Sequence, residues 1–379
     1  LVGLGEKMAE RFLPVYLMAL GGGVLSVGLL NGMDNLLSAL YSYPGGYLSD
    51  RLGHKKALLV FNLLALFGFL IVILFPSWYM VIVGAVFFLS WTAISLPATM
   101  SLISNVLPKN KRTMGVSVHS LVRRIPMALG PILGGTLIQT YGIRTGTRAA
   151  FGAAFVLGIV SLFMQQALIT DEEGTLGKRV AESNPLRMFK LMSRSLRALL
   201  VSDILVRFCE QIPYAFLAIW SLDYAGITPV QFGLLTAIEM VTAMLVYIPV
   251  AYLADRGTKK PFVAITFGFF TLFPLMLMFS RSMPMLVLAF ILRGLKEFGE
   301  PTRKALIMDL APEGRKAGMF GVYYLARDIV VSLAAFGGAL LWRVSPQVNF
   351  TIAFAFGILG TAFFILFGHD LGKATDQPA

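Results

Sequence analysis

Cysteine and histidine are scarce in this chain, and a nucleotide-binding sequence motif is missing. Its 379 residues include one cysteine, Cys209, and three histidines. A single cysteine excludes an intrachain disulfide and a cysteine-based metal cluster. The histidines form no cluster with metal-ligand spacing, and the sequence contains neither a nucleophile motif nor a phosphate-binding GxxxxGK[ST] loop. We therefore expect no enzymatic activity, no ATP hydrolysis, no bound metal and no cofactor.

Charged residues are also few. Asp, Glu, Lys and Arg make up 14% of the chain, whereas hydrophobic residues make up 57% and the mean hydropathy is +0.76. Soluble domains carry about 25% charged residues. Apolar runs of about 20 residues recur along the chain, and this is the length of a bilayer-crossing helix. The composition predicts an all-α polytopic membrane protein, whose net charge of +12 reports membrane orientation and not nucleic-acid binding.

Glycine, proline and charged residues divide the chain into about twelve expected membrane-spanning helices. We expect these to end near residues 20, 48, 75, 106, 141, 169, 224, 253, 279, 310, 342 and 367. The predicted domains are an N-terminal six-helix bundle at 1–170, a cytoplasmic linker at 171–196, a C-terminal six-helix bundle at 197–368 and a cytoplasmic tail at 369–379.

The linker contains a basic amphipathic stretch. Between residues 185 and 197, Leu186, Phe189 and Met192 alternate with Lys and Arg. This pattern predicts a helix that lies on the inner membrane surface.

Lysine and arginine are distributed unequally between alternate loops. One set of loops holds the linker cations and Arg51, Lys55, Lys56, Lys109, Lys111, Arg112, Arg256, Lys259, Lys260, Arg315 and Lys316. The opposite set holds Arg144, Arg148, Arg281 and Arg343. Because basic loops remain on the cytoplasmic side, both termini are predicted to be cytoplasmic, in the inner (plasma) membrane of a bacterium.

A charged turn recurs at half the length of the chain. Gly46-Tyr47-Leu48-Ser49-Asp50-Arg51-Leu52-Gly53-His54-Lys55-Lys56 has a counterpart in Ala251-Tyr252-Leu253-Ala254-Asp255-Arg256-Gly257-Thr258-Lys259-Lys260. The same offset relates Asp34 to Glu239 and Pro44 to Pro249. Such a repeat indicates two copies of one module.

Two six-helix halves, each with this loop after its second helix, resemble the Major Facilitator Superfamily over essentially the whole chain. The resemblance implies two pseudo-symmetric six-helix bundles around a cavity that opens alternately to each side, powered by an ion or solute gradient. It also implies that the loop residues form a gate at the cytoplasmic contact between the halves. The gating residues carried over are Gly46, Asp50, Arg51, Gly53, Asp255 and Arg256.

Intramembrane charges mark the candidate site, because an unpaired charge at the bilayer centre costs about 2.5–3.5 kcal/mol. Expected helices 3, 6, 9 and 12 lack charged residues in their cores, which agrees with the lipid-facing positions that the resemblance gives them. We predict that carboxylates on the other helices carry the coupled proton, from among Glu6, Glu10, Asp34, Glu210, Glu239, Glu297, Glu300 and Asp328. Basic and aromatic residues are predicted to bind substrate, namely Arg11, Arg123, Arg124, Arg207, Lys296, Arg327, Tyr41 and Trp220.

Spacing suggests that some of these charges share a helix face. Asp203, Arg207 and Glu210 form one stripe in expected helix 7. In expected helix 10, residues 293–303 are predicted to form a continuous charged stripe about 15 Å long.

The cues to the cargo differ. Gly130-Pro131-Ile132-Leu133-Gly134-Gly135 is similar to the GPxxGG element of proton-coupled drug antiporters, in which glycines permit close helix packing. Glu6-Lys7-Met8-Ala9-Glu10-Arg11-Phe12 is similar to the ExxERF signature of proton-coupled peptide transporters, with one extra residue. A cavity rich in arginine suits anionic or zwitterionic solutes better than lipophilic cations.

The sequence therefore predicts a monomeric, proton-coupled secondary transporter for a small polar, anionic or zwitterionic solute, with export favoured over uptake. The alternatives are a multidrug/H⁺ antiporter for lipophilic cations and a proton-coupled importer of peptide-like solutes. A membrane sensor built on a transporter scaffold is a further alternative from a different class.

Overall fold

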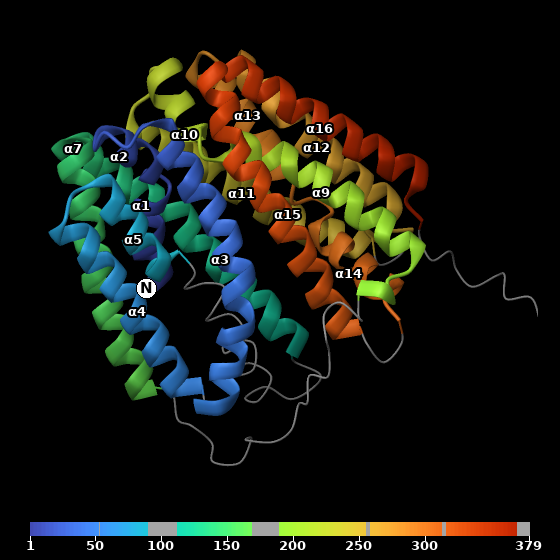
Figure 1. Ribbon diagram of the computed structural model, residues 1–379, viewed down its shortest axis with the longest axis horizontal. Coiled ribbons are helices and arrows are strands. Elements are labelled where there is room, and N and C mark those ends of the chain that lie inside the picture. The colour runs from blue at the N-terminus through green and yellow to red at the C-terminus, as the bar shows by residue number, and fades with distance from the viewer. Residues whose placement is uncertain (53, 90–111, 169–188, 255–257, 313–315, 370–379) are drawn as a thin grey trace, which may run out of the picture. The chain divides into compact units, whose positions relative to one another are not determined.

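The computed structural model (Figure 1) describes residues 1–52, 54–89, 112–168, 189–254, 258–312 and 316–369. All regular structure within these ranges is helical. The first helices are α1 (Val2–Glu10), α2 (Leu13–Ala19), α3 (Gly23–Leu52), α4 (His54–Leu74), α5 (Trp78–Phe88) and α7 (Arg112–Leu168). The later helices are α9 (Arg194–Tyr214), α10 (Leu217–Ile219), the π-helical turn η2 (Trp220–Tyr224), α11 (Pro229–Ala254), α12 (Lys260–Phe279), α13 (Met283–Leu295), α14 (Glu300–Leu310), α15 (Lys316–Val344) and α16 (Pro346–Phe367).

Six stretches within the described ranges are long and apolar enough to cross a membrane. They are Lys55–Leu74, Val122–Leu168, Pro229–Val246, Lys260–Phe279, Met319–Val344 and Pro346–Phe367. The 47-residue stretch contains two expected spans, because Gly142 (φ 78°) interrupts the helical backbone of α7. The sequence predicts this boundary near Tyr141. Other expected spans miss the criterion where breaks or charges interrupt them, as in α1–α2 and α13–α14.

The first expected span is broken, whereas we predicted a continuous helix to Leu20. Helix α1 ends at Glu10 and α2 begins at Leu13, with Pro14 in its first turn. Proline lacks an N–H group, and its ring collides with the carbonyl of the residue four positions earlier, which is Glu10. The break therefore falls where the proline requires it.

The tenth expected span is broken in the same way, which corrects the predicted continuous stripe of charges. Helix α13 ends at Leu295, residues 296–299 form a turn, and α14 begins at Glu300 with Pro301 in its first turn. The turn closes with short-range bonds such as Phe298 N–H to the Leu295 carbonyl, at 2.9 Å. Lys296 consequently lies in the turn and Glu300 starts a new helix.

The seventh expected span is interrupted too. Helix α9 ends at Tyr214, and Phe216 precedes the short α10 with φ −94° and ψ −1°. Phe12 precedes α2 with nearly the same backbone angles, −101° and −2°. The two halves of the chain thus share a break at equivalent places, as expected for copies of one module.

The residues form two compact units. Unit 1 contains residues 1–179, 215–240 and 281–283, and unit 2 contains residues 180–214, 241–280 and 284–379. The predicted domain limits, 1–170 and 197–368, remain a prediction. Each unit is described by itself below.

Glycines allow α7 to approach α1 closely in unit 1. A Cβ atom added at Gly130 would lie 2.8 Å from the Lys7 carbonyl carbon, and one at Gly134 would collide with the Met8 carbonyl oxygen. The packing role predicted for the Gly130–Gly135 stretch is thus confirmed at these two glycines.

Two arginines of unit 1 hold helix ends. Arg144 donates to the Ala19 carbonyl from Nε at 2.9 Å and from Nη2 at 2.6 Å, and Arg148 donates in the same manner to the Ile73 carbonyl. These carbonyls belong to the last turns of α2 and α4, where cations are favourable. This contact gives Arg144 and Arg148 a structural role on the side predicted to be poor in cations.

Helix α9 is the central helix of unit 2, where it packs against α12, α15 and α16. It contributes Leu196, Leu199 and Val206 to a buried cluster with Phe267, Tyr323 and other residues. The same helix carries Asp203, Arg207 and Glu210, and the candidate site begins with these charges.

Candidate functional site

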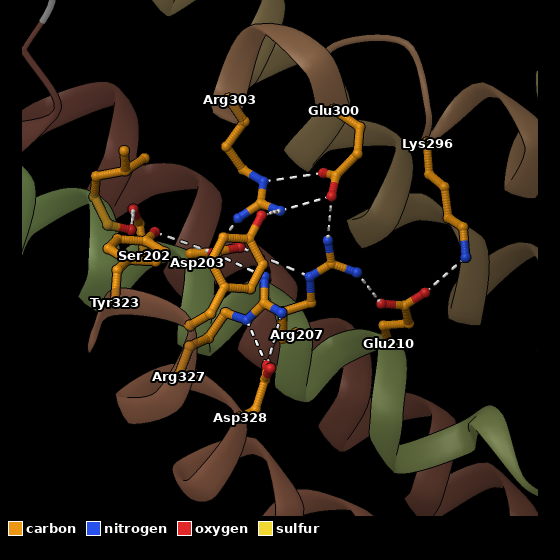
Figure 2. A network of polar contacts seen from close by, with 12 residues as sticks. Ser202, Asp203, Arg207, Glu210, Lys296, Glu300, Arg303, Tyr323, Arg327 and Asp328 are labelled. Carbon is orange, nitrogen blue, oxygen red and sulfur yellow. Dashed lines mark hydrogen bonds and ion pairs between the residues drawn. The ribbon is translucent and has the colours of Figure 1, made fainter. Parts of the chain in front are cut away.

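Eight charged residues of unit 2 form a series in which cations and anions alternate, shown in Figure 2. We call it the ion-pair series, and its order is Lys296, Glu210, Arg207, Glu300, Arg303, Asp203, Arg327 and Asp328. It contains four cations and four anions, so its formal charge sums to zero. Three segments supply it: α9, the α13–α14 break with α14, and α15.

The contacts at the Lys296 end are short and well formed. Lys296 Nζ donates to Glu210 Oε1 at 2.6 Å, and Arg207 Nη1 donates to Glu210 Oε2 at 2.6 Å. Arg207 Nη2 reaches Glu300 Oε1 at 3.0 Å. Each carboxylate here lies between two cations, so both of its oxygens are occupied.

Arg303 and Asp203 form the most deeply buried pair of the series. Their side chains are 0% and 1% exposed, and Arg303 Nη1 donates directly to Asp203 Oδ2. Arg303 also donates to Glu300 from Nε at 2.9 Å and from Nη2 at 2.6 Å. The Tyr323 hydroxyl donates to Asp203 at 3.0 Å. Asp203 Oδ2 thus carries the close contacts, whereas Asp203 Oδ1 is buried without a hydrogen bond and lies 3.7 Å from Arg207 Nε. Charges this buried are tolerated only when they are paired.

Arg327 and Asp328 end the series on α15. Arg327 Nη1 lies 3.5 Å from Asp203 Oδ2, and its Nε donates to Asp328 Oδ1 at 2.7 Å. The guanidinium of Arg327 also stacks on the Tyr324 ring, with 4.1 Å between Cζ and the ring centroid. With 26% of its side chain exposed, Asp328 is the most accessible acid of the series.

The break between α13 and α14 is itself held by a side chain. Gly299 N–H donates to Thr266 Oγ1 of α12 at 2.5 Å. A side chain at position 299 would meet the Phe262 carbonyl oxygen at 2.5 Å, so only glycine fits this approach. The contact fixes the start of α14, and therefore the place of Glu300 and Arg303.

Unit 1 holds a second group of charges, around Glu6 and Asp34. Lys7 donates to Glu10 and lies 3.5 Å from Glu6 Oε1. Glu6 is 4% exposed, and its Oε2 atom is buried without a hydrogen-bond partner. The Glu6 carboxylate is in electrostatic contact with Asp34 of α3 and with Arg123 of α7.

Asp34 has fewer close contacts with cations than Glu6. It interacts electrostatically with Glu10, Lys7 and Arg11. No ion pair within 4.0 Å joins it to a cation in the described part of the chain. Glu6 is thus a buried acid with one unpartnered oxygen, and Asp34 is a half-buried acid. Glu210 and Glu300 of the ion-pair series differ, since each lies between two cations.

The structure brings most of the predicted site residues into these two groups. Arg207, Lys296, Arg327, Glu210, Glu300 and Asp328 belong to the ion-pair series, and Glu6, Glu10, Asp34, Arg11 and Arg123 belong to the group in unit 1. Arg124 is half-buried beside Arg123 on α7, Glu239 is buried in α11, and Glu297 lies in the turn between α13 and α14.

The two predicted aromatic residues make packing contacts within unit 1. Tyr41 packs against Ala57 and Phe61. Trp220 is fully buried, stacks on Tyr224 at 4.9 Å and lies under the Arg281 guanidinium at 4.4 Å.

The predicted gating residues are only partly described. Gly46, Asp50 and Arg51 lie on the backbone of α3, and their side chains are outside the described part. Gly53, Asp255 and Arg256 lie outside the described residues.

The predicted proton-coupling and substrate-binding residues did not include Asp203 and Arg303, although Asp203 links Arg303 to Arg327 within the series. The spacing of Asp203 and Arg207 placed them on one face of a helix. It gave no information about their partners on α14 and α15, about 100 residues away in sequence.

The helices, the repeated module and the buried charges define the class of the molecule: a polytopic α-helical membrane protein with paired charges inside its helical units. The family model of the Major Facilitator Superfamily matches residues 1–222 and 199–378, and the chain belongs to this family. The resemblance stated from the charged turn is therefore confirmed, as is the fold. Transport of small-molecule substrates across the membrane is the activity of the family.

Relatives and solved structures agree with this assignment. The uncharacterized MFS-type transporter MJ1317 of Methanocaldococcus jannaschii is 25% identical over 358 residues, which cover 92% of this chain and 87% of the relative. The multidrug resistance protein MdtG of Enterobacter lignolyticus is 26% identical over 70% of this chain and 64% of its own. A POT family transporter in complex with 5-aminolevulinic acid has a TM-score of 0.78 at 13% identity, covering 97% of this chain and 94% of that chain. This last likeness concerns the fold alone.

Proposed function

We propose that the protein is a proton-coupled secondary transporter whose coupling site is the Glu6–Asp34 group of unit 1. The observation that carries the proposal is the difference between the two groups of acids. Glu210 and Glu300 each lie between two cations, and Asp203 accepts from Arg303 and Tyr323. Protonation of Glu210 or Glu300 would remove the counter-charge of buried cations, so we assign these acids a structural role.

Glu6 and Asp34 have the properties that a proton carrier needs. Glu6 is buried and its Oε2 atom has no hydrogen-bond partner, and Asp34 is half-buried without an ion pair in the described part of the chain. Burial without full pairing favours the neutral form of a carboxyl group, so gain and loss of a proton lie closer in free energy. The coupling ion is therefore proposed to be H⁺, and no cofactor is required.

The proposed cargo is a small polar solute that is anionic or zwitterionic. The ion-pair series is neutral, so its arginines are engaged by the protein itself. Arg123 of α7 is the cation of unit 1 that we assign to an anionic group, since it is half-buried and in electrostatic contact with Glu6. When Glu6 and Asp34 are protonated, the group of charges in unit 1 becomes more positive, which would link proton occupancy to anion affinity.

A second candidate is a multidrug/H⁺ antiporter, which two observations favour. The cations of unit 2 are neutralised, and one relative is named a multidrug resistance protein. A transporter confers resistance by moving a compound out of the cell, so this relative also supports export as the direction. The importer of peptide-like solutes has the Glu6–Phe12 pattern in its favour.

We further propose that the protein works as a monomer in a bacterial inner membrane with both termini in the cytoplasm. The unequal distribution of Lys and Arg supports this orientation. The cytoplasmic gate formed by the Asp50 and Asp255 turns remains part of the proposal.

A ligand screen followed by a flux assay tests the function. Melting temperatures of the purified protein are measured at pH 6 and pH 7.5 with organic anions, zwitterions and lipophilic cations, because a true ligand stabilises the folded state as its site fills. The stabilising compound is then imposed as a gradient across proteoliposomes that contain a pH-sensitive dye. Stabilisation by anions or zwitterions, with a pH change during flux, is expected. Stabilisation by cations alone would establish the second candidate, and flux without a pH change would contradict proton coupling.

A further inference from the structure

Unit 2 presents an exposed basic and apolar segment just before and within the first turn of α9. We call residues 189–197 the basic segment. Lys190, Arg194 and Arg197 are exposed on it, and Arg197 Nη2 donates to the Lys190 carbonyl at 3.1 Å. Within the described part of the chain, neither the Lys190 ammonium group nor the Arg194 guanidinium group has an ion-pair partner. The positive charge of the segment is therefore not balanced by described residues of the protein.

The arginines at the start of α9 do not stabilise this helix. Arg194 and Arg197 lie in the first turn of α9, which contains no acidic residue. The N-terminal end of a helix carries partial positive charge, so cations there are unfavourable. An external anion would remove this repulsion.

Apolar side chains stand beside the cations. Phe189 is 40% exposed and Leu191 is 46% exposed, whereas Met192 and Leu196 are buried in the core of unit 2. The segment is also held by Ser193, whose Oγ donates to the Leu310 carbonyl at 3.4 Å and accepts from Leu196 N–H at 3.2 Å. Phe189 and Leu191 thus point outward from a segment that is fixed to the fold.

The same end of unit 2 contains further basic and apolar groups. Leu310, which receives the Ser193 contact, follows Asp309, and Asp309 pairs with Lys259 before α12. Lys260 Nζ donates to the Ile365 carbonyl at 2.9 Å, near the end of α16, where Leu366 is 71% exposed. The starts of α9 and α12 and the ends of α14 and α16 therefore meet around this surface.

We propose that the basic segment binds anionic phospholipid headgroups of the surrounding membrane. Exposed cations beside exposed aromatic and aliphatic side chains fit the boundary between headgroups and acyl chains, where phosphates meet the cations and Phe189 and Leu191 enter the apolar layer. A zwitterionic lipid offers the apolar layer without the net negative charge. This inference does not depend on the cargo or on proton coupling.

Lipid binding to the purified full-length chain tests the proposal. Native mass spectrometry compares phosphatidylglycerol with phosphatidylcholine of the same acyl chains. A cation at an anionic lipid surface contributes about fivefold to binding, so the double substitution Arg194→Gln/Arg197→Gln is expected to weaken phosphatidylglycerol binding about 30-fold. The single substitution Arg194→Gln is expected to weaken it about fivefold, and Arg343→Gln, at an exposed arginine near the end of α15, is the matched control for that single substitution. The control is expected to leave binding unchanged.

Further experiments distinguish anionic lipid from other molecules that could bind the basic segment. Phe189→Ser/Leu191→Ser should weaken both lipids alike, because it removes the apolar contact and retains the charges. Equal binding of both lipids, or unchanged phosphatidylglycerol binding after the double arginine substitution, would overturn the proposal. If inorganic phosphate, added at the same concentration as the lipid, displaced phosphatidylglycerol, the segment would be a site for free anions instead. Loss of a dimer signal in the arginine variant would show that a second copy of the chain occupies the segment.

Discussion

Asp203 is the residue on which the charge balance of unit 2 depends most. Its carboxylate accepts from Arg303 and Tyr323 and lies 3.5 Å from Arg327, with 1% of its side chain exposed. No other acid of the series combines this burial with contacts to both α14 and α15. The charge of Asp203 therefore holds three helices together through groups that would be unfavourable in isolation.

Asp203→Asn is expected to destabilise the protein by about 3–5 kcal/mol, because the amide keeps the shape of the side chain and removes the buried negative charge that Arg303 shares with Arg327. The free energy of unfolding in mixed micelles measures this loss. Asp309→Asn is the matched control, since the Lys259–Asp309 pair is 21% and 37% exposed and pairs of this kind contribute about 1 kcal/mol or less. Equal losses in the two variants would contradict the role given to Asp203.

At the scale of helices, unit 2 holds its broken elements with polar side chains from neighbouring helices. Asn349 at the start of α16 donates from Nδ2 to the Ile212 carbonyl at 3.2 Å and to the Gly338 carbonyl at 2.8 Å. Ile212 lies near the end of α9, where the helix gives way to the turn before α10. Thr266 does the same for the start of α14. Side chains of neighbouring helices therefore stabilise the backbone at these two breaks.

Asn349→Leu should cost about 1–3 kcal/mol, because it removes the buried side-chain donor that the Ile212 and Gly338 carbonyls share. Thermal unfolding of the detergent-solubilised protein measures the effect. Thr351→Val in the same helix is the control, since Thr351 is exposed and makes only a weak contact with the sulfur of Met278. A variant at position 349 as stable as this control would show that the carbonyls find other donors.

Gly134→Ala should disrupt the packing of α7 on α1, because the added Cβ atom would collide with the Met8 carbonyl oxygen. We expect a loss of melting temperature together with reduced transport, since the displaced helix α1 carries Glu6. Gly152→Ala in the same helix has open space around the new atom and should be neutral or slightly stabilising. If both variants melt alike, the close approach of the two helices is not required.

At the scale of the whole molecule, the predicted orientation can be read with cysteine chemistry. Cys209 is the only cysteine and is buried, so it should remain silent toward a membrane-impermeant maleimide. In intact cells, Ser282→Cys at the start of α13 should react from outside, and Lys190→Cys should react only after the membrane is opened. The reverse pattern of labelling would place the basic loops outside.

Much of the fold could be predicted because hydropathy, the repeated charged turn and the unequal placement of Lys and Arg are properties of the chain itself. The helix breaks were harder to foresee. Pro14 and Pro301 lie in first turns where helices restart, whereas Pro126 and Pro131 lie inside α7 without ending it. The effect of a proline depends on whether neighbouring groups satisfy the freed backbone, which is decided by tertiary packing.

The sequence could predict which charged residues belong to the candidate site, but it could not predict which of them form ion pairs with one another. Intramembrane charges identified both groups of residues, because each charge must be paired or hydrated. Which cation meets which anion depends on how α9, α14 and α15 are rotated and placed. For that reason Arg207, Lys296 and Arg327 were predicted as substrate ligands, although the structure binds each of them to acids of the same unit.

The central claim is that Glu6 and Asp34 couple transport to protons while the ion-pair series supports the fold. The direct test compares two rates in proteoliposomes for the solute found by the ligand screen: flux driven by a pH gradient and gradient-free counterflow. Glu6→Gln and Asp34→Asn should lose most of the driven flux and retain counterflow, whereas Asp309→Asn should retain both. If both substitutions left the ratio of driven flux to counterflow at the value of the unmodified protein, proton coupling would have to reside elsewhere in the molecule.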